Sequence, residues 1–253
     1  MRPVSVNGMR DYSGEFYEKT GQVAGASARA IVPLLLQLID ARRVVDVGCG
    51  TGEWLRAFME CGVKDVLGVD GEWVAPAGLK IPPQRFARHD LRTPLRLGET
   101  FDLVVSLETA EHLPEAVAGT FVESLTGLGP VVLFSGAIPF QGGTGHVNEQ
   151  WPDYWAAHFR RHGYVAVDCL RRQIWNNQAV AWYYAQNLLL FVEEGHLKTC
   201  AALRPHGGDI GDVPLSLVHP RMYLDKVNQI RLGHVIRLKL SALKQAVKSL
   251  ARR

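Results

Sequence analysis

The chain has 253 residues, 47% of them hydrophobic and 21% charged, a composition typical of a globular protein with a substantial core. Its net charge of +3 is unevenly distributed along the chain. Eight of the 28 Lys and Arg residues follow Asp225, but none of the 25 acidic residues does. The part of the chain up to Asp225 is therefore acidic, which argues against nucleic-acid binding by that part. The chain has no membrane-spanning apolar run, no recognisable signal peptide and no Cys-x-x-Cys pair among its four cysteines, which argues against a zinc site or a disulfide framework and favours a cytoplasmic location.

Short Val- and Leu-rich runs alternate with helical stretches over the first 200 residues. The runs are 43–48, 65–70, 101–107 and 130–136, and the helical stretches are 28–41, 52–62, 116–127 and 152–163. This alternation predicts an α/β fold with a mostly parallel sheet and helices on both faces. Two further runs, 164–170 and 184–192, are joined without room for a packed crossover helix, so we expect them to form an antiparallel hairpin.

The end of the chain differs in character. Residues 195–220 are rich in Gly, Pro and His and predict a linker between a domain at 1–194 and a helical tail at 221–253. The tail is basic and carries an apolar stripe. Three interpretations stay open: a peripheral membrane anchor, a docking helix, or a terminal helix packed on its own domain or on a partner in a homodimer.

The sequence VVDVGCGTGEW at 44–54 follows the first expected strand and opens a helix, where a glycine turn lets a ligand approach the backbone. Gly48, Gly50 and Gly52 give G-x-G-x-G and not the G-x-G-x-x-G of dinucleotide-binding folds. Asp46 and Glu53 flank this turn. Two carboxylates would repel a pyrophosphate but suit a ligand with an ammonium and a sulfonium, so the motif predicts a cationic cofactor.

With these motifs in order, residues 12–192 resemble a class I S-adenosylmethionine-dependent methyltransferase. The resemblance implies a Rossmann-like sheet of seven strands whose last strand is antiparallel, and S-adenosylmethionine as cofactor. Asp70 matches the acidic residue that binds both ribose hydroxyls, and Asp90 the residue that accepts from the adenine amine. The cofactor-binding residues implied are Asp46, Gly48, Cys49, Gly50, Gly52, Asp70, Gly71, Trp73, Asp90, Leu91, Leu107 and Glu108.

The segment GGTGHVNEQWPDYW at 142–155 leaves the carboxyl end of the run at 130–136 and should lie beside the donor methyl group. A hydroxyl acceptor needs a base, and a histidine near its ordinary pKa suits that role. We therefore expect His146 to be the general base and Glu149 its support. The alternative is that His146 caps the following helix. In the methyltransferases that the chain resembles, the histidine at the position of His112 has a supporting role. Glu108 and Glu111 could bind a cation, but we predict no metal.

The acceptor side resembles bacterial methyltransferases of glycan biosynthesis, which implies an O-methyltransferase for a sugar of a glycan, glycolipid or polysaccharide precursor. Tryptophan faces and Asn amides suit carbohydrate. The candidate substrate contacts are Tyr17, Asn148, Trp151, Trp175 and Asn176. Trp151 with Trp155 could instead pack a helix on the sheet. Two other functions stay open: methylation of a small natural product, and a membrane- or partner-binding module with an accessory methyltransferase domain.

Overall fold

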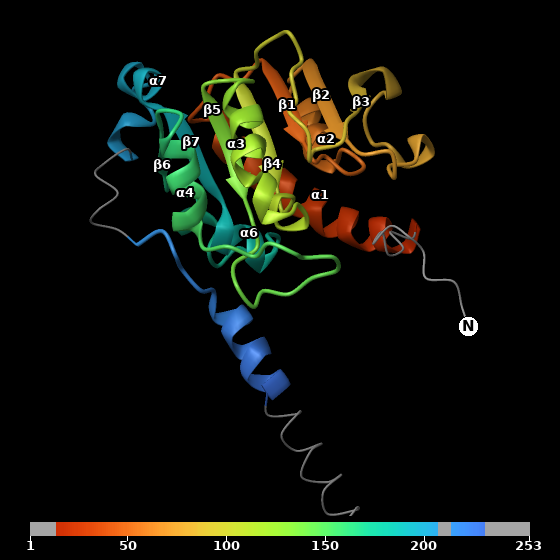
Figure 1. The fold of residues 1–253 in the computed structure, drawn as a ribbon, viewed down its shortest axis with the longest axis vertical. Helices are drawn as coiled ribbons and strands as arrows, with labels where there is room; N and C mark the ends of the chain where they lie inside the picture. Colours follow the sequence, from red (N-terminus) through yellow and green to blue (C-terminus); the bar gives the residue numbers. More distant parts are fainter. Residues whose placement is uncertain (1–13, 207–213, 231–253) are drawn as a thin grey trace, which may run out of the picture. The chain divides into compact units, whose positions relative to one another are not determined.

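The computed structural model describes residues 14–206 and 214–230, and the chain divides into two compact units, residues 1–217 and 218–253. The first unit contains a seven-stranded sheet with the order β3-β2-β1-β4-β5-β7-β6 (Figure 1). All neighbours are parallel except for β7, which is antiparallel to both β5 and β6. The strands are β1 Arg43–Val47, β2 Asp65–Asp70, β3 Phe86–Arg88, β4 Leu103–Leu107, β5 Val131–Ser135, β6 Tyr164–Val167 and β7 Leu189–Glu193.

Two apolar clusters cover the two faces of this sheet. Alternate residues of one strand enter different clusters, as Val44 and Val45 of β1 do, because successive side chains of a strand point to opposite faces. The predicted α/β fold with helices on both faces is thereby confirmed. The helices are α1 Gly14–Leu36, α2 Glu53–Glu60, α3 Ala118–Thr126, α4 Pro152–Arg160, α5 Arg171–Ile174, α6 Trp182–Asn187 and α7 Glu194–Thr199, with single 3-10 turns at Pro76–Gly78, Pro83–Arg85, Ala110–His112, Glu115–Val117 and Arg204–His206.

The predicted antiparallel pairing of 164–170 with 184–192 is confirmed, because β6 pairs with β7, but the second strand starts later than predicted and helices lie between the two. Residues 182–187 form α6, and β7 begins only at Leu189. The aromatic run that opens α6 packs inward: Tyr184 is buried, and its hydroxyl accepts a hydrogen bond from the Trp54 indole at 3.3 Å. Two short helices therefore separate β6 from β7, and β7 enters the sheet between β5 and β6.

Helix α1 begins well before the predicted start at residue 28. Gly21 and Gly25 lie in it, and both face the Glu53 side chain at the start of α2; a Cβ on Gly25 would come within 2.9 Å of a Glu53 carboxylate oxygen. Glycine lowers intrinsic helix propensity. Glycine at these two positions lets α1 approach the start of α2 closely. The packing between the two helices stabilises the longer α1.

Part of the segment 195–220 packs on the first unit. Leu197, Leu203 and Leu215 are buried in its two cores. Arg171, 1% exposed, donates from Nη1 to the carbonyl of Leu215 at 2.7 Å and from Nη2 to the Asp168 carboxylate at 2.7 Å. The packed domain thus extends beyond residue 194.

In the second unit, residues 220–230 are helical, with Tyr223, Leu224 and Ile230 exposed. The remainder of the predicted tail lies outside the described residues. Among the described helices, none is both long enough and apolar enough to cross a membrane.

Candidate active site

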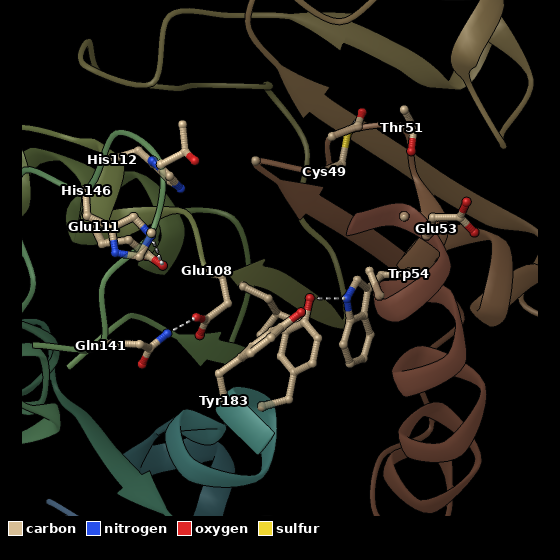
Figure 2. A pocket seen from close by; sticks show the side chains of 18 of the residues that line it. Cys49, Thr51, Glu53, Trp54, Glu108, Glu111, His112, Gln141, His146 and Tyr183 are labelled. Atoms are coloured by element: carbon tan, nitrogen blue, oxygen red, sulfur yellow. Dashed lines mark hydrogen bonds and ion pairs between the residues drawn. The ribbon is translucent and has the colours of Figure 1, made fainter. Parts of the chain in front are cut away.

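A cavity of about 520 Å³ lies at the carboxyl ends of β1 and β4 (Figure 2). Helix α1, the glycine turn, the β4 exit, the 141–146 segment and α6 all contribute to its walls. Ligands of open parallel sheets collect at this edge. The lining residues are Gly21, Ala24, Asp46, Gly48, Cys49, Gly50, Thr51, Glu53, Trp54, Leu107, Glu108, Glu111, His112, Gln141, Gly142, Gly143, Thr144, His146, Trp182, Tyr183 and Tyr184.

The glycine turn after β1 has the backbone conformation that only glycine adopts without strain. Gly48, Gly50 and Gly52 have φ angles of 87°, 53° and 88°. A Cβ on Gly48 would also stand 2.3 Å from the Thr109 side chain. The turn is fixed to the end of β2, because Asp70 accepts hydrogen bonds from the amides of Gly50 at 2.7 Å and Gly71 at 2.6 Å.

Two carboxylates are buried beside this turn. Burial, and then the nearby Asp70, raise the pKa of Asp46 well above its usual value. Burial also raises the pKa of Asp70, against the opposing effect of hydrogen bonds from Gly50, Gly71 and Trp73. No cationic side chain pairs with either group among the described ion pairs. A cationic ligand would favour the ionised form of both carboxyl groups, so the site suits the ammonium and sulfonium of S-adenosylmethionine.

Half of the predicted cofactor residues do not line the cavity, namely Gly52, Asp70, Gly71, Trp73, Asp90 and Leu91. The indole of Trp73 packs against the Cα of Gly71, where an added Cβ would meet ring carbons at 2.2 Å, and it contacts Asp70. Asp90 is exposed and pairs with the Arg92 guanidinium at 2.7 Å, which holds the pKa of Asp90 below its usual value. Leu91 is buried in the core. Adenine contacts by these residues stay predictions.

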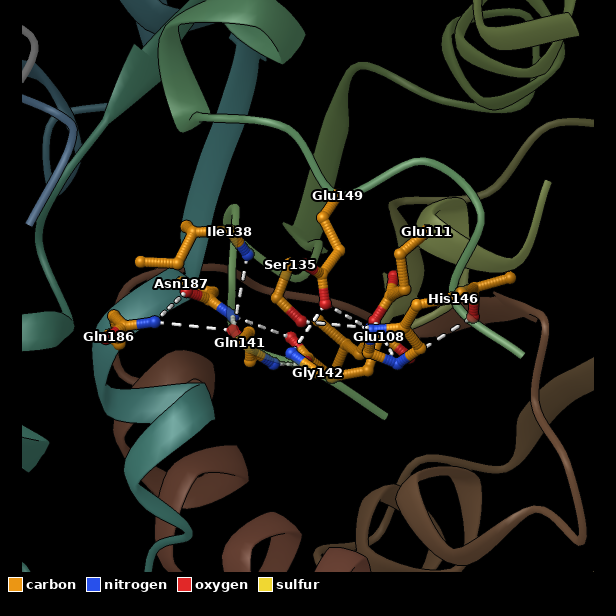
Figure 3. A network of polar contacts seen from close by, with 12 residues as sticks. Glu108, Glu111, Ser135, Ile138, Gln141, Gly142, His146, Glu149, Gln186 and Asn187 are labelled. Carbon is orange, nitrogen blue, oxygen red and sulfur yellow. Dashed lines mark hydrogen bonds and ion pairs between the residues drawn. The ribbon is translucent and has the colours of Figure 1, made fainter. Parts of the chain in front are cut away.

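Glu108, the first residue after β4, is held in place by a polar network (Figure 3). Its φ of 49° is unusual for a residue other than glycine. Gln141 donates to one carboxylate oxygen at 2.8 Å, and Asn187 donates to the other at 3.1 Å. Burial raises the pKa of Glu108 against these hydrogen bonds. The side chain is thus fixed at the cavity wall predicted to face the methionyl group.

The structure brings His146 and Glu149 together, as the sequence predicted. Nδ1 of His146 lies 2.9 Å from Oε1 of Glu149, and the same carboxylate accepts hydrogen bonds from the amides of Phe140 and Gly142. Gly143 packs directly on the imidazole, because a Cβ there would lie 2.2 Å from Nε2. The glycines therefore let the loop fold around His146, while Glu149 fixes its ring.

A second group of side chains meets His146 from the other side. Nε2 of His146 lies 4.0 Å from Oε1 of Glu111, and the His112 and His146 rings make an edge contact with centroids 4.9 Å apart (Figure 2). The amides of Val147 and Asn148 donate to the Glu111 carbonyl. Burial, and then the nearby His146, lower the pKa of His112 to about 4, so its ring is neutral.

The predicted substrate contacts are spread over several places. Asn148 is buried, and its side-chain oxygen accepts from Gln150 at 3.0 Å. Trp151 is 40% exposed at the start of α4. Trp175 is half-buried and Asn176 exposed, after α5. None of these four lines the cavity, and their contacts with substrate stay predictions. The side chain of Tyr17 lies outside the described parts.

Trp155 and Ser27 take packing roles. Trp155 is buried against Phe134, so it packs α4 on the sheet. Ser27 donates to the Val23 carbonyl and accepts from the Ala181 amide, which joins α1 to the start of α6.

Sequence reasoning missed several residues that line the cavity. Trp182 and Tyr183 of α6 lie there, and so do Gln141 and Trp54. The aromatic run AWYYAQN at 181–187 was the available signal. Its helical conformation, which points these rings into the cavity, depends on packing against residues far away in the sequence.

Solved structures with similar folds include a sugar N-methyltransferase from Streptoalloteichus sp. ATCC 53650, with a TM-score of 0.54, 17% identity, and coverage of 76% of this chain and 98% of that one. Magnesium protoporphyrin IX methyltransferase from Synechocystis PCC 6803, with bound SAH, has a TM-score of 0.51 and 18% identity, covering 74% of this chain and 90% of that one. No curated protein sequence matches the chain.

The family model described as a methyltransferase domain matches residues 20–179, more than half of the chain. This range contains the glycine turn, the β4 exit and the His146 loop. The chain therefore belongs to this family of methyltransferase domains, which confirms the predicted family and, with it, S-adenosylmethionine as the cofactor.

Proposed function

We propose that the chain methylates a hydroxyl of a sugar in a glycan, glycolipid or polysaccharide precursor. The observation that carries this proposal is that His146, held by Glu149 with 2.9 Å between Nδ1 and Oε1, lines the same cavity as the glycine turn. A hydroxyl is a weak nucleophile and needs its proton removed as it reacts, whereas a donor site alone would need no such pair.

The anionic end of the cavity holds the donor. Asp46, which lines the cavity, would face the cationic groups, and Asp70, bound to the amide of Gly50 behind the turn, would reach the ribose hydroxyls. When bound, S-adenosylmethionine supplies a methyl group on a positively charged sulfur that leaves as a neutral thioether.

The acceptor end is built around His146. Glu149 accepts from Nδ1–H, which fixes the tautomer and leaves Nε2 as the atom that can act on the acceptor. In the simplest form of the reaction, Nε2 takes the proton of the acceptor hydroxyl as the oxygen becomes methylated. A side chain at position 143 would collide with this nitrogen, since an added Cβ would lie 2.2 Å from it.

Two observations support a sugar as the acceptor. Trp182 and Tyr183 present aromatic surface in the cavity, and such faces stack on sugar C–H groups. A neighbour in fold is named a sugar N-methyltransferase, which agrees with this acceptor class.

An acceptor screen with labelled methyl donor tests the proposal. Free sugars, nucleotide sugars and glycolipids are offered in parallel with amino sugars and with phenolic small molecules. We expect transfer to a sugar hydroxyl, seen as an alkali-stable methyl ether by mass spectrometry. Label found only on an amine or on a phenol would contradict the proposal and favour the N-methylation or natural-product alternatives.

A further inference from the structure

The strongest feature that the proposed reaction does not use is the group formed by Glu111, His112 and His146. One ligand atom from each lies within 4.8 Å of the other two. Glu111 and His112 belong to the 3-10 turn after β4, and His146 comes from the loop after β5, so two neighbouring strand ends bring them together. Figure 2 shows the three side chains converging at one end of the cavity.

Glu111 lies in this group as a carboxylate without a hydrogen-bond partner. Its side chain is 0% exposed, and neither oxygen makes a hydrogen bond to any described residue. The backbone amides of Glu111 and Ala137 are near enough to favour its charged form, whereas burial, Glu108 and Glu149 disfavour that form. A buried carboxylate costs several kcal/mol unless an ion or a hydrogen bond compensates it.

The neighbouring imidazoles do not supply this compensation. His146 stands 4.0 Å from Glu111, beyond hydrogen-bond distance, and its Nδ1 already faces Glu149. His112 is neutral, and its Nδ1 is buried without a partner among the described residues. The group therefore combines two buried carboxyl oxygens without a hydrogen-bond partner with imidazole nitrogens that can donate a lone pair.

We propose that Glu111, His112 and His146 bind one divalent first-row transition-metal cation at the acceptor end of the cavity. One carboxylate and two imidazoles form a ligand set that suits Mn²⁺, Co²⁺ or Zn²⁺ better than Mg²⁺, which prefers oxygen ligands. Atoms bound to one ion at about 2.1 Å lie at most about 4.2 Å apart, so the 4.8 Å spread needs a closure of under about 1 Å.

Glu149 would not bind the cation itself but would hold one of its ligands, His146, in place. A metal-bound histidine usually donates its other N–H to a carboxylate, which fixes the ring and strengthens the ligand. The contact between Nδ1 of His146 and Glu149 has this form, and it leaves Nε2 toward Glu111. The sequence predicted no metal because Glu108 and Glu111 stood alone on one turn; the fold adds His146 from 35 positions further along.

The role of the cation rests on the proposed function. Three protein ligands leave coordination positions open for the acceptor hydroxyl. A hydroxyl bound to the cation would lose its proton more easily, and solvent would take up that proton, because the cation would occupy Nε2 of His146. His146 thus acts as a ligand in the metal-bound enzyme and holds the acceptor oxygen near the donor end.

Cobalt titration of the full-length, chelator-treated protein tests the site without any substrate. We expect one equivalent of Co²⁺ to give visible d–d absorption, with affinity at least tenfold lower in Glu111→Gln, His112→Gln and His146→Gln. Glu149→Gln should weaken binding by roughly 10–100-fold. His162→Gln, which removes an exposed histidine outside the cavity, is the matched control and should bind as the wild type does.

Unchanged S-adenosylmethionine affinity shows that each variant is folded, and if Glu111→Gln does not fold, the two histidine variants carry the test. Absence of saturable Co²⁺ binding, or equal affinity in all variants, overturns the metal site. An enzyme that is active without metal but inactive as His146→Ala would also overturn it, while leaving sugar methylation with a histidine base intact. Failure of the acceptor screen with intact Co²⁺ binding would overturn only the proposed function.

Discussion

At the scale of single residues, the donor site depends on carboxylates that are buried without a cationic partner. Asp70 has two tasks, because in the free protein it accepts from the amides of Gly50 and Gly71, and with donor bound it would accept from ribose hydroxyls as well. Asp70→Ala should therefore weaken S-adenosylmethionine binding by at least about tenfold, the value of one charged hydrogen bond or more.

Isothermal titration calorimetry measures this loss. Asp65→Ala is the matched control, since Asp65 lies at the other end of the same strand and pairs with Arg43 and Arg85 at the surface. Equal donor affinity in Asp70→Ala and Asp65→Ala would remove Asp70 from the donor site.

Asp46 predicts a pH dependence of donor binding. Its pKa in the free protein is raised by burial and by Asp70, so its ionisation opposes folding as the pH rises through that value, and a bound cation relieves the cost. Donor affinity should rise with pH through the range in which Asp46 loses its proton. Calorimetry over this range tests the trend, and Asp46→Asn should bind more weakly with a flatter profile. A falling affinity would contradict the assignment.

His146 should matter to turnover and not to donor binding. His146→Ala removes either the base or the cation ligand, so we expect turnover to fall by roughly 10²–10⁴ while S-adenosylmethionine affinity stays within a factor of two of wild type. Turnover is measured on the best acceptor from the screen. His162→Ala serves as control, and wild-type turnover in His146→Ala would take His146 out of the reaction.

At the scale of elements, the turn between β1 and α2 is the part most dependent on glycine. Gly48 and Gly62 both have positive φ, but an added Cβ meets Thr109 at 2.3 Å in the first case and nothing within 4 Å in the second. Gly62→Ala should cost about 1 kcal/mol of the free energy of unfolding, from backbone strain alone. Gly48→Ala should cost about 1–3 kcal/mol more and abolish donor binding.

Urea unfolding with calorimetry of donor binding checks the pair. If both variants lost the same free energy of unfolding, the contact with Thr109 would make no contribution to stability.

The sequence was most informative where a motif is local. The glycines of the turn and Asp46 lie within seven residues, so their spacing alone predicts a strand, a turn and a cofactor. Trp182 and Tyr183 could not be found in this way, because they reach the cavity only after α6 packs against Trp54, some 130 positions away. That Glu111 is buried without a hydrogen-bond partner could not be predicted either, because it depends on which distant segments cover it.

At the scale of the whole molecule, charge separates the two ends of the sequence. Residues 226–253 carry a charge of +8, and residues 1–225 carry −5. A basic helix with an apolar stripe is attracted to anionic membranes. If residues 221–253 form a peripheral anchor, the full chain should pellet with liposomes containing anionic lipid, and a chain lacking these residues should stay in the supernatant. Equal pelleting would exclude the anchor and favour a docking or dimer role.

The buried guanidinium of Arg171 has a consequence for how the protein is made. Its hydrogen bond to the carbonyl of Leu215 ties the last part of the first unit to residues near β6. A nascent chain that has reached only residue 194 contains every strand of the sheet, yet Arg171 still lacks one of its acceptors. Folding during synthesis is therefore expected to finish late, only after Leu215 has left the ribosome.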